Sequence, residues 1–269
     1  MKIAVTGYEG GLVRDRLVSL GVEPIDVDIL DEDSLNDELQ TILPDVVIHA
    51  AAMTDVDRCE LDYKRAFQVN VRGTMYVAEA CNRIGARMVY LSTCHVFDGT
   101  KKESYSENSR PNPKNAYGFT KWTGEVITQS TANNFLIVRI SKLFGSERFR
   151  KYLDSPERID VPTFMFRNYT HVNLFCDMLL DVIKKPFYNG KFLLNLGTSD
   201  SCSSFDFFQE LYEHLGIDTR LIIPRGVELA SFVFRPNNGS LDMSFAKRSG
   251  LELPTILDGI LLVKKELGV

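Results

Sequence analysis

The sequence predicts an α/β protein in which a doubly wound parallel sheet is joined to a smaller C-terminal lobe. Short apolar runs alternate with amphipathic segments of helical length. The apolar runs are almost continuous, as expected for parallel strands that are buried on both faces. A glycine-rich turn directly follows the first run, where a strand would lead into a helix. Together these observations indicate repeated strand–helix units.

The first half of the chain carries the regular alternation. Apolar runs predict five strands, over Lys2–Thr6, Ile25–Val27, Asp45–His49, Arg87–Leu91 and Phe135–Val138. The segments between them predict four helices, over Leu12–Leu20, Ser34–Ile42, Tyr63–Ile84 and Tyr117–Ser130. A chain that repeats strand and helix in this way forms a Rossmann-like, doubly wound sheet.

The second half of the chain is less regular. The stretch Phe144–Pro162 is charged and reads as irregular. Later segments predict the helix His171–Lys185, the strand Phe192–Leu196, the helix Phe205–Leu215, the short strand Leu221–Ile223 and the helix Pro254–Leu267. We therefore expect a dinucleotide-binding core over residues 1–140, continued by about 171–198. A substrate-binding lobe would comprise about 141–170 and 199–269.

Composition narrows the classes of partner. With 269 residues, of which 44% are hydrophobic and 25% charged, the chain can bury a sizeable core. Its formal net charge of −5 offers no long-range attraction for nucleic acid or an anionic membrane. No apolar run approaches the ~20 residues of a membrane span, and we expect no signal peptide. The five cysteines are scattered and lack metal-ligand spacing, so we expect reduced thiols, no metal and a cytoplasmic location.

Tyr117 and Lys121 form the most informative pair of residues. Four residues apart in a helix, their side chains project from one face. A phenol beside an ammonium group can donate a proton near neutral pH, because the positive charge lowers a pKa that starts near ~10. Such a pair suits carbonyl reduction, in which the new alkoxide takes up a proton as hydride arrives. A solvated helix face would show the same spacing, so the pair gains weight only from its context.

Small residues at the strand ends supply that context. Glycines after the first strand allow a tight turn, so that backbone N–H groups can approach a pyrophosphate at the start of the next helix. The run Ala50–Ala52 leaves room for the flat groups of a cofactor, or serves tight packing. His49 reads as a hydrogen-bonded core residue. Thr93, at the end of the fourth strand, either points into the crevice where α/β sheets bind ligands or caps a turn.

Further motifs extend along nearly the whole chain. The central ones are Ser92-Thr93, Val96-Phe97-Asp98-Gly99, a polar loop to Pro111, and Tyr117-Gly118-x-x-Lys121-x-x-Gly124-Glu125. The others are Asp28-Ile29, Ala50–Ala52 with Thr54, Val56-Asp57, Glu60, Asn70, Arg139 with Ser141, Thr170 with Val172, and Arg235-Pro236. The joint pattern resembles the extended short-chain dehydrogenase/reductases. Within them it is most similar to the dTDP-4-dehydrorhamnose reductases, which reduce the C4 ketone of a nucleotide-linked 6-deoxy sugar.

The resemblance implies a role for each matching residue. Tyr117 would be the general acid, Lys121 would hold the nicotinamide ribose and tune Tyr117, and Thr93 would orient the substrate ketone. Gly10, Gly11 and Leu12 would meet the pyrophosphate, and Asp28 and Ile29 the adenine. The implied cofactor site also includes Gly7, Ala50, Ala51, Ala52, Leu91, Tyr117 and Lys121. The cofactor would be NADP(H) or NAD(H). Asp28 could instead accept from a ribose 2′-hydroxyl and favour NAD, and no basic residue follows Asp26 or Asp28 to hold a 2′-phosphate.

The chain departs from the family where it would touch the substrate. Cys94 and His95 replace Asp and Tyr, Lys142 replaces Trp, and Phe164-Met165 replaces Asp-Gln. We expect Cys94 to fill space, His95 to be a second acid or base or a hydrogen-bonded structural residue, and Lys142 to meet a phosphate or remain solvated. Substrate contacts are expected from Thr93, Cys94, His95, Lys142 and Arg235. In the glycine turn, Val13 stands in place of a third glycine, so we expect the helix to be pushed outward and cofactor binding to weaken.

Three readings of function remain open from the sequence. The first is an NAD(P)H-dependent reductase of a nucleotide-activated 4-keto-6-deoxy sugar, acting in sugar or polysaccharide biosynthesis. The second is a nucleotide-sugar epimerase, which returns the hydride to the sugar carbon that lost it. The third is a non-catalytic regulatory subunit such as that of methionine adenosyltransferase, to which the resemblance also extends. A homodimer is among the assemblies open to the chain.

Overall fold

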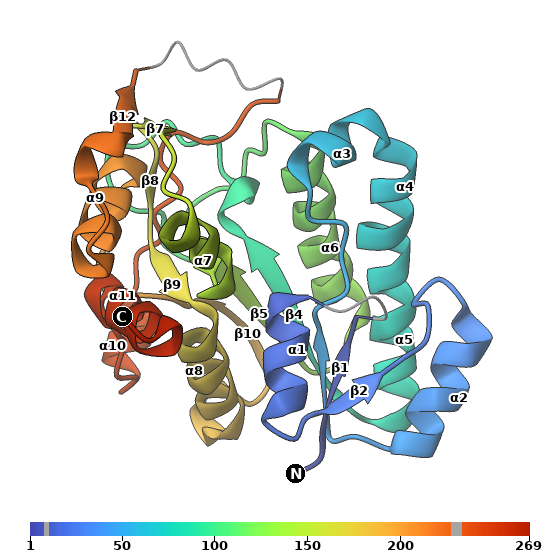
Figure 1. Ribbon diagram of the computed structural model, residues 1–269. Helices are drawn as coiled ribbons and strands as arrows, with labels where there is room; N and C mark the ends of the chain where they lie inside the picture. The colour runs from blue at the N-terminus through green and yellow to red at the C-terminus, as the bar shows by residue number, and fades with distance from the viewer. Residues whose placement is uncertain (8–10, 227–232) are drawn as a thin grey trace.

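The centre of the molecule is a six-stranded, fully parallel sheet in the order β10-β5-β4-β3-β1-β2 (Figure 1). This computed structural model describes residues 1–7, 11–226 and 233–269. The strands are β1 (Ile3–Thr6), β2 (Glu23–Ile25), β3 (Val46–His49), β4 (Arg87–Thr93), β5 (Phe135–Ile140) and β10 (Lys191–Asn195). Helices cover both faces, so the predicted doubly wound α/β fold is confirmed.

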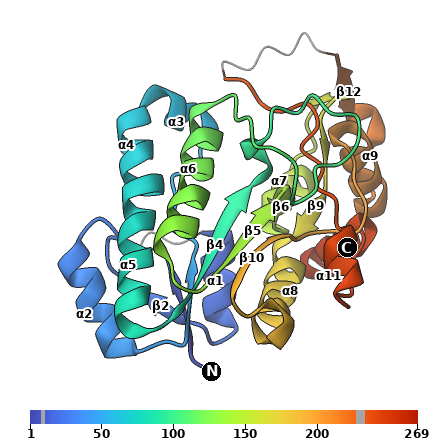
Figure 2. The same ribbon diagram turned by 180° about the vertical axis from the view of Figure 1, so that it is seen from behind.

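Successive residues of each strand divide between two hydrophobic clusters. In β3, Val46 and Ile48 pack beneath α1 (Leu12–Ser19) and α8 (Val172–Lys184). Val47 faces the opposite cluster, which includes α2 (Glu32–Ile42) and α5 (Thr74–Ile84). Figure 2 shows this second side of the sheet, with α6 (Ala116–Thr131) beside α5. Burial on both faces explains why the strands read as continuous apolar runs.

The direction of strand addition reverses at β1, which lies between β2 and β3. Thr6 at the end of β1 pairs with His49 at the end of β3. Gly7 and Ala50, the next residues, therefore lie at the switch point of the sheet. Ligands of doubly wound sheets bind in the crevice outside the carboxyl ends of the strands at this point.

The helix predicted over Tyr63–Ile84 is interrupted in the structure. It comprises α4 (Tyr63–Phe67), a π-helix (Gln68–Gly73) and α5, and α3 (Val56–Leu61) precedes it. Asn70 in the π-helix accepts from the Met53 N–H at 2.7 Å and donates to the Met53 carbonyl and the Thr120 hydroxyl, each at 3.0 Å. The wider turn thus carries a buried amide that joins the crevice loop to α6, a contact that periodicity does not reveal.

Two further expectations are corrected. The second strand is β2, which ends at Ile25 rather than Val27, because its partner β1 ends at Thr6 and the glycine turn offers no further pairing. The stretch Phe144–Pro162 is not irregular, since it contains α7 (Glu147–Asp154) and β7 (Ile159–Pro162). Only Phe149 and Tyr152 of α7 are buried, and the surrounding charges obscure this short apolar face in the sequence.

A third cluster is built from the later part of the chain. It joins α7 and β7 to α9 (Ser204–Leu215), β12 (Ile222–Arg225) and α11 (Ile256–Leu267). Phe207 stacks on Tyr169 at its centre, with ring centroids 4.0 Å apart. Three short pairs lie around it: β6 (Lys142–Phe144) with β9 (Tyr169–His171), β8 (Phe166–Arg167) with β11 (Cys202–Ser203), and β7 with β12. Helix α10 (Ser244–Arg248) instead packs against the first core cluster through Ala246. None of the helices in the described ranges is long and apolar enough to cross a membrane.

Candidate active site

The structure brings Thr93, Tyr117 and Lys121 together at the carboxyl end of β4. Thr93 is the last residue of β4 and Tyr117 lies in the first turn of α6, and the Thr93 hydroxyl is close enough to lower the pKa of the Tyr117 phenol. Lys121 follows one turn later, and its Nζ lies 4.1 Å from the centre of the Tyr90 ring. A hydroxyl, a phenol and an amine thus converge on the crevice edge of the sheet.

Two glycines let α6 approach β4 closely. A Cβ at Gly118 would lie 2.1 Å from the carbonyl oxygen of His95, and one at Gly124 would lie 2.1 Å from the Tyr90 hydroxyl. The Tyr90 hydroxyl also donates to the Lys121 carbonyl at 3.1 Å. Both glycines are therefore needed for the distance between the strand that carries Thr93 and the helix that carries Tyr117.

A buried ion pair fixes α6 against the sheet beyond Gly124. Arg139 in β5 donates from Nε and Nη2 to the two oxygens of Glu125 in α6, at 2.8 and 2.7 Å. The Ser92 hydroxyl donates to the same carboxylate at 2.6 Å. The side chains of Arg139 and Glu125 are only 3% and 2% exposed, so this bidentate pair is shielded from water. The network ties α6 to both β4 and β5.

Burial determines the protonation of the central residues. It raises the pKa of Tyr117 above its ordinary value, although the neighbouring Thr93 hydroxyl acts in the opposite direction. The expectation that Lys121 lowers the pKa of Tyr117 is therefore wrong for the protein alone, because desolvation of the phenolate dominates. Burial lowers the pKa of Lys121 to about 7, against an opposing effect of Glu125. Tyr117 thus holds its proton at neutral pH, as a general acid requires.

The residues expected to touch substrate lie around this centre. Cys94 is fully buried and donates to the Ser141 carbonyl at 3.4 Å. The His95 ring meets the Tyr117 ring edge-on, with centroids 5.4 Å apart. Lys142 is exposed. Its pKa is lowered by partial burial and by the positive charges of Arg148, Arg167 and Arg235. Positive charge therefore gathers on this side of the site.

Arg235 joins the later part of the chain to α3. Its Nη2 donates to the Asp57 carboxylate at 2.7 Å, and its Nη1 donates to the Val233 carbonyl at 3.0 Å. The hydrogen bond from Arg235 lowers the pKa of Asp57. A substrate that engaged this guanidinium would share it with, or take it from, Asp57.

The turn after β1 fits a dinucleotide phosphate. Gly7 has φ +142° and Gly11 has φ +134°, a region that side chains rarely adopt. The Gly11 N–H at the start of α1 donates to the Asp15 carboxylate at 3.2 Å, and Leu12 is exposed at the first helical position, so an anion bound at Gly11 would take the place of Asp15. Gly10, the remaining predicted residue of this turn, lies outside the described residues. Val13 packs against the first core cluster, which explains an apolar residue at this position.

The other predicted cofactor residues lie along the same edge. Ala51 donates its N–H to the Thr6 hydroxyl at 3.1 Å, which places the run Ala50–Ala52 beside β1. His49 exchanges hydrogen bonds with Thr6 and Thr74, at 2.9 and 3.1 Å, so the interpretation as a hydrogen-bonded core histidine is confirmed. Leu91 is buried in the core cluster beneath α1 and α8.

A basic residue of α1 that sequence reasoning missed lies near the end of β2. Arg14 of α1 pairs with the Asp26 carboxylate and lies over Gly7, where an added Cβ would be 3.0 Å from Arg14 Cδ. Asp28 is exposed and accepts from the Leu30 N–H, while Ile29 is buried. The positive charge near Asp26 comes from Arg14 in the preceding helix α1 and not from a residue that follows Asp26 or Asp28 in the sequence.

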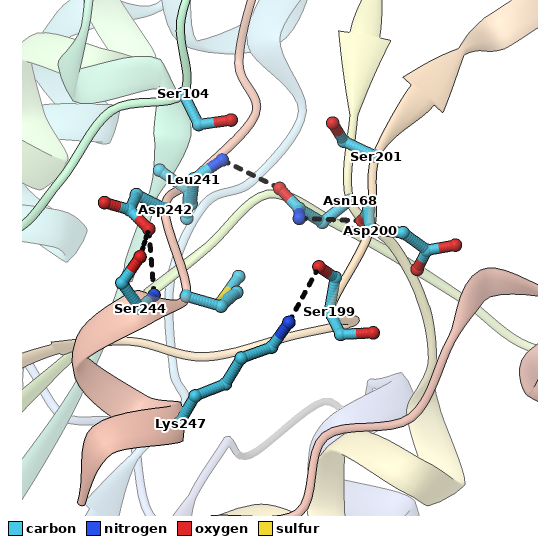
Figure 3. Close-up of a pocket in the computed structure, with 10 residues that line it drawn as sticks. Ser104, Asn168, Ser199, Asp200, Ser201, Leu241, Asp242, Ser244 and Lys247 are labelled. Carbon is cyan, nitrogen blue, oxygen red and sulfur yellow. Dashed lines mark hydrogen bonds between the residues drawn. The ribbon is translucent and has the colours of Figure 1, made fainter.

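Two hollows lie near or beside this site. One of about 220 Å³ opens at the start of α1, where it is lined by Leu12, Gly145, Arg148, Val172 and neighbouring residues. The other, of about 180 Å³, is polar (Figure 3). There Lys247 donates to the Ser199 carbonyl, and Asn168 bridges the Leu241 N–H and the Asp200 carbonyl. None of the predicted site residues lines the second hollow, so the first is the better candidate for a cofactor.

A glycine turn at the switch point of a parallel sheet, with Thr93, Tyr117 and Lys121 at the crevice, defines the short-chain dehydrogenase/reductase class. Within it, residues 1–265 match the family model described as the RmlD substrate binding domain, and the chain belongs to this family. The predicted resemblance to dTDP-4-dehydrorhamnose reductases is thereby confirmed.

Individual relatives cover nearly the full length of the chain. The spore coat polysaccharide biosynthesis protein SpsK of Bacillus subtilis (strain 168) is 27% identical over 264 residues, covering 93% of this chain and 92% of that protein. The dTDP-4-dehydrorhamnose reductase of Escherichia coli (strain K12) is 27% identical over 257 residues, covering 89% and 85%. A crystal structure of dTDP-4-dehydrorhamnose reductase from Bacillus anthracis str. Ames, in complex with NADP, superposes with a TM-score of 0.90 at 27% identity, covering 99% and 100%.

Proposed function

We propose that this protein is an NAD(P)H-dependent reductase of a nucleotide-activated 4-keto-6-deoxy sugar. The observation that carries the proposal is the placement of Thr93, at the end of β4, beside a protonated Tyr117, with Lys121 one turn away on the same helix. Family membership and the reductases among its relatives supply the substrate class. Because one of these relatives is a complex with NADP, the cofactor of this chain is proposed to be NADP(H), with NAD(H) as the alternative.

The chemistry divides between cofactor and chain. The bound nicotinamide would supply a hydride, that is, a hydrogen together with the two electrons that reduce the carbonyl carbon. Tyr117 donates its proton to the carbonyl oxygen, which completes the alcohol, and the phenolate then regains a proton from solvent. Thr93 orients the carbonyl oxygen toward Tyr117. Lys121 in its charged form stabilises the transient phenolate, and its pKa of about 7 leaves a substantial charged fraction at neutral pH.

The residues that would hold the cofactor line the switch point. Gly7, Gly11 and the first turn of α1 would receive the pyrophosphate, and Ala50–Ala52 would leave room for its flat groups. Arg14 of α1, which pairs with Asp26 just after β2, is suited to a 2′-phosphate, whereas Asp26 and Asp28 are suited to a free ribose hydroxyl.

The sugar nucleotide would lie between the two parts of the chain. We infer that residues 1–140 and about 171–198 bind the cofactor, while about 141–170 and 199–269 bind the substrate. The cations Lys142, Arg167 and Arg235 would offset the charge of its diphosphate. A cytoplasmic location and assembly as a homodimer stay predictions.

Replacing Tyr117 with Phe tests this function. The variant keeps the ring but loses the proton donor, so turnover of a 4-keto sugar nucleotide should fall by roughly 10²–10⁴-fold. Its affinity for NADPH, measured by fluorescence titration, should stay near that of the parent. A Tyr117→Phe variant as active as the parent would sink the mechanism. A parent that binds cofactor but turns over no keto-sugar would favour a regulatory subunit, and exchange at the C4 carbon without net cofactor oxidation would favour an epimerase.

A further inference from the structure

The ring of His95 packs against the ring of Tyr117, the proposed proton donor. The two rings meet at an interplanar angle of 72°. One ring nitrogen, Nδ1, lies 3.1 Å from the side-chain amide nitrogen of Asn115. The state of His95 therefore depends on how the Asn115 amide is oriented.

The orientation of Asn115 is settled by two independent contacts. Its Oδ1 accepts from the Gly118 N–H at 2.7 Å, as the cap of α6. Its Nδ2 donates to the Phe234 carbonyl at 2.9 Å. Exchanging the oxygen and nitrogen would place two donors together at Gly118 and two acceptors together at Phe234. The amide group that faces His95 is therefore the NH₂ group.

This orientation determines the tautomer of His95. Because Asn115 donates to Nδ1, that nitrogen must carry a lone pair, and a neutral ring then carries its hydrogen on Nε2. Burial and the nearby cations Arg167, Lys142 and Arg235 lower the pKa of His95 to about 3, so the ring is neutral at physiological pH. In the described parts of the chain no acceptor is found for the Nε2–H group. Among the residues that the structure describes, the ring thus presents one unpaired donor beside Tyr117.

We propose that His95 uses its Nε2–H as a hydrogen-bond donor to a hydroxyl or carbonyl oxygen of the keto-sugar next to the reacting carbon, and that Asn115 is the positioning residue that selects this tautomer. The inference rests on the proposed function and deepens it. It gives a specific form to the substrate contact expected of His95 from the sequence, and a neutral donor is neither an acid or base catalyst nor only a structural residue. A donor at His95 Nε2 would also favour substrates that place an acceptor oxygen beside this nitrogen.

The tautomer can be measured without substrate. In long-range ¹H–¹⁵N spectra of the apo protein, His95 should show a protonated Nε2 and an unprotonated Nδ1, unchanged between about pH 5.5 and 8.5. Asn115→Asp keeps an oxygen to cap α6 but can only accept from His95, so Nδ1 should carry the hydrogen in this variant at high pH. A parent His95 that is protonated on Nδ1, or on both nitrogens, would overturn the proposal.

Substrate affinity tests the second half of the proposal. The dissociation constant for dTDP-4-keto-6-deoxyglucose, measured by calorimetry on Tyr117→Phe to prevent turnover, should rise about 10- to 100-fold when Asn115→Asp is added at pH 8.5. Lowering the pH should reduce this defect, because an imidazolium beside the new carboxylate regains its Nε2–H. The Tyr117→Phe parent should show no such recovery. An Asn115→Asp defect that does not change with pH would indicate a structural role and overturn the proposal.

Matched substitutions of His95 separate donation from packing. His95→Gln retains an N–H donor and should keep more affinity than His95→Phe, which retains only the ring. Asn115→Ser provides the control, since it caps α6 without imposing either tautomer. Equal affinity of His95→Phe and the parent would contradict donation by His95. None of these binding measurements requires turnover, so failure of the reductase function itself would appear separately, in the Tyr117→Phe assay.

Discussion

At the scale of single residues, Lys121 combines charge with deep burial. It is 3% exposed and lies over the Tyr90 ring. The ring offers a cation–π contact and Glu125 offers an opposite charge, yet burial still lowers the pKa of Lys121 to about 7. A buried lysine whose pKa lies near neutral pH lowers the stability of the folded state and is typical of a functional site.

Replacing Lys121 with Met should change how stability depends on pH. An unfolded lysine titrates near ~10.4, so between about pH 7 and 10 the unfolded chain binds more protons than the folded one. Stability therefore rises with pH in this window, by up to about 1.4 kcal/mol per pH unit from this group. Lys121→Met removes the rise. Urea unfolding of both proteins from pH 6 to 10 measures the difference, and parallel profiles would contradict the folded-state pKa of Lys121.

Substrate preference is also decided residue by residue. The resemblance to the dehydrorhamnose reductases implies that Cys94, His95, Lys142 and Phe164 stand where those enzymes would hold their nucleotide sugar. Loss of two or three buried polar contacts, at ~1–3 kcal/mol each, would lower efficiency by roughly a hundredfold or more. We therefore expect dTDP-4-dehydrorhamnose to be a poor substrate and a differently substituted keto-sugar to be better. Values of kcat/KM across a panel decide this; a best value for the dehydrorhamnose nucleotide would show that the replacements are neutral.

At the scale of elements, α6 and its neighbours determine the geometry of the site. The helix is capped by Asn115, is joined to β5 through the Glu125–Arg139 pair, and touches the loop after β4 at Gly118. Each contact fixes the position of a different part of the helix. The distance between Tyr117 and Thr93 is therefore a property of the packed pair of elements and not of either one.

Gly118→Ala tests this dependence. The new methyl group would lie 2.1 Å from the His95 carbonyl oxygen, so α6 or the loop must move. We expect a loss of about 1–3 kcal/mol in unfolding free energy and a larger fall in kcat than in cofactor affinity. Gly226→Ala is the matched control, because nothing lies within 4 Å of its added Cβ and its φ is not in the left-handed region. Similar effects of the two substitutions would show that the close approach at Gly118 is unimportant.

At the scale of the whole molecule, the cofactor should link distant parts of the chain. The proposed site draws on the turn after β1, the run after β3, the end of β4 and α6, which meet only in the folded protein. A ligand that binds all of them stabilises the folded state and not the unfolded one. Thermal unfolding is thus a test of the cofactor site that needs no substrate.

NADPH should raise the melting temperature of the protein. At about 100 times its Kd, the ligand adds about 2.7 kcal/mol of stability, or roughly 5–10 °C for a chain of this size. Val13→Gly should tighten binding and enlarge the shift at a given concentration, because a smaller residue lets α1 pack closer to the sheet. NADH is the comparison ligand. If neither cofactor shifts the transition at millimolar concentration, the dinucleotide site is refuted.

Much of this protein could be predicted because the signals are local. Strand and helix periodicity, the residues that tolerate a tight turn, and the Tyr117–Lys121 spacing depend on neighbours along the chain. These established the doubly wound fold, and the matching motifs identified the family. The errors fell where local signals are weak, as in α7, whose apolar face is two residues, and in the π-helix around Asn70.

Only the tertiary structure decided the chemistry of the individual groups. Arg14 meets Asp26 across 12 positions, Glu125 meets Arg139 across 14, and Asn115 meets His95 across 20. Burial rather than sequence spacing set the pKa of Tyr117 and Lys121. The sequence by itself indicated that Thr93, Tyr117 and Lys121 belong together at the crevice. Their protonation and tautomers depend on desolvation and on partners from other elements, and these exist only once the chain has packed.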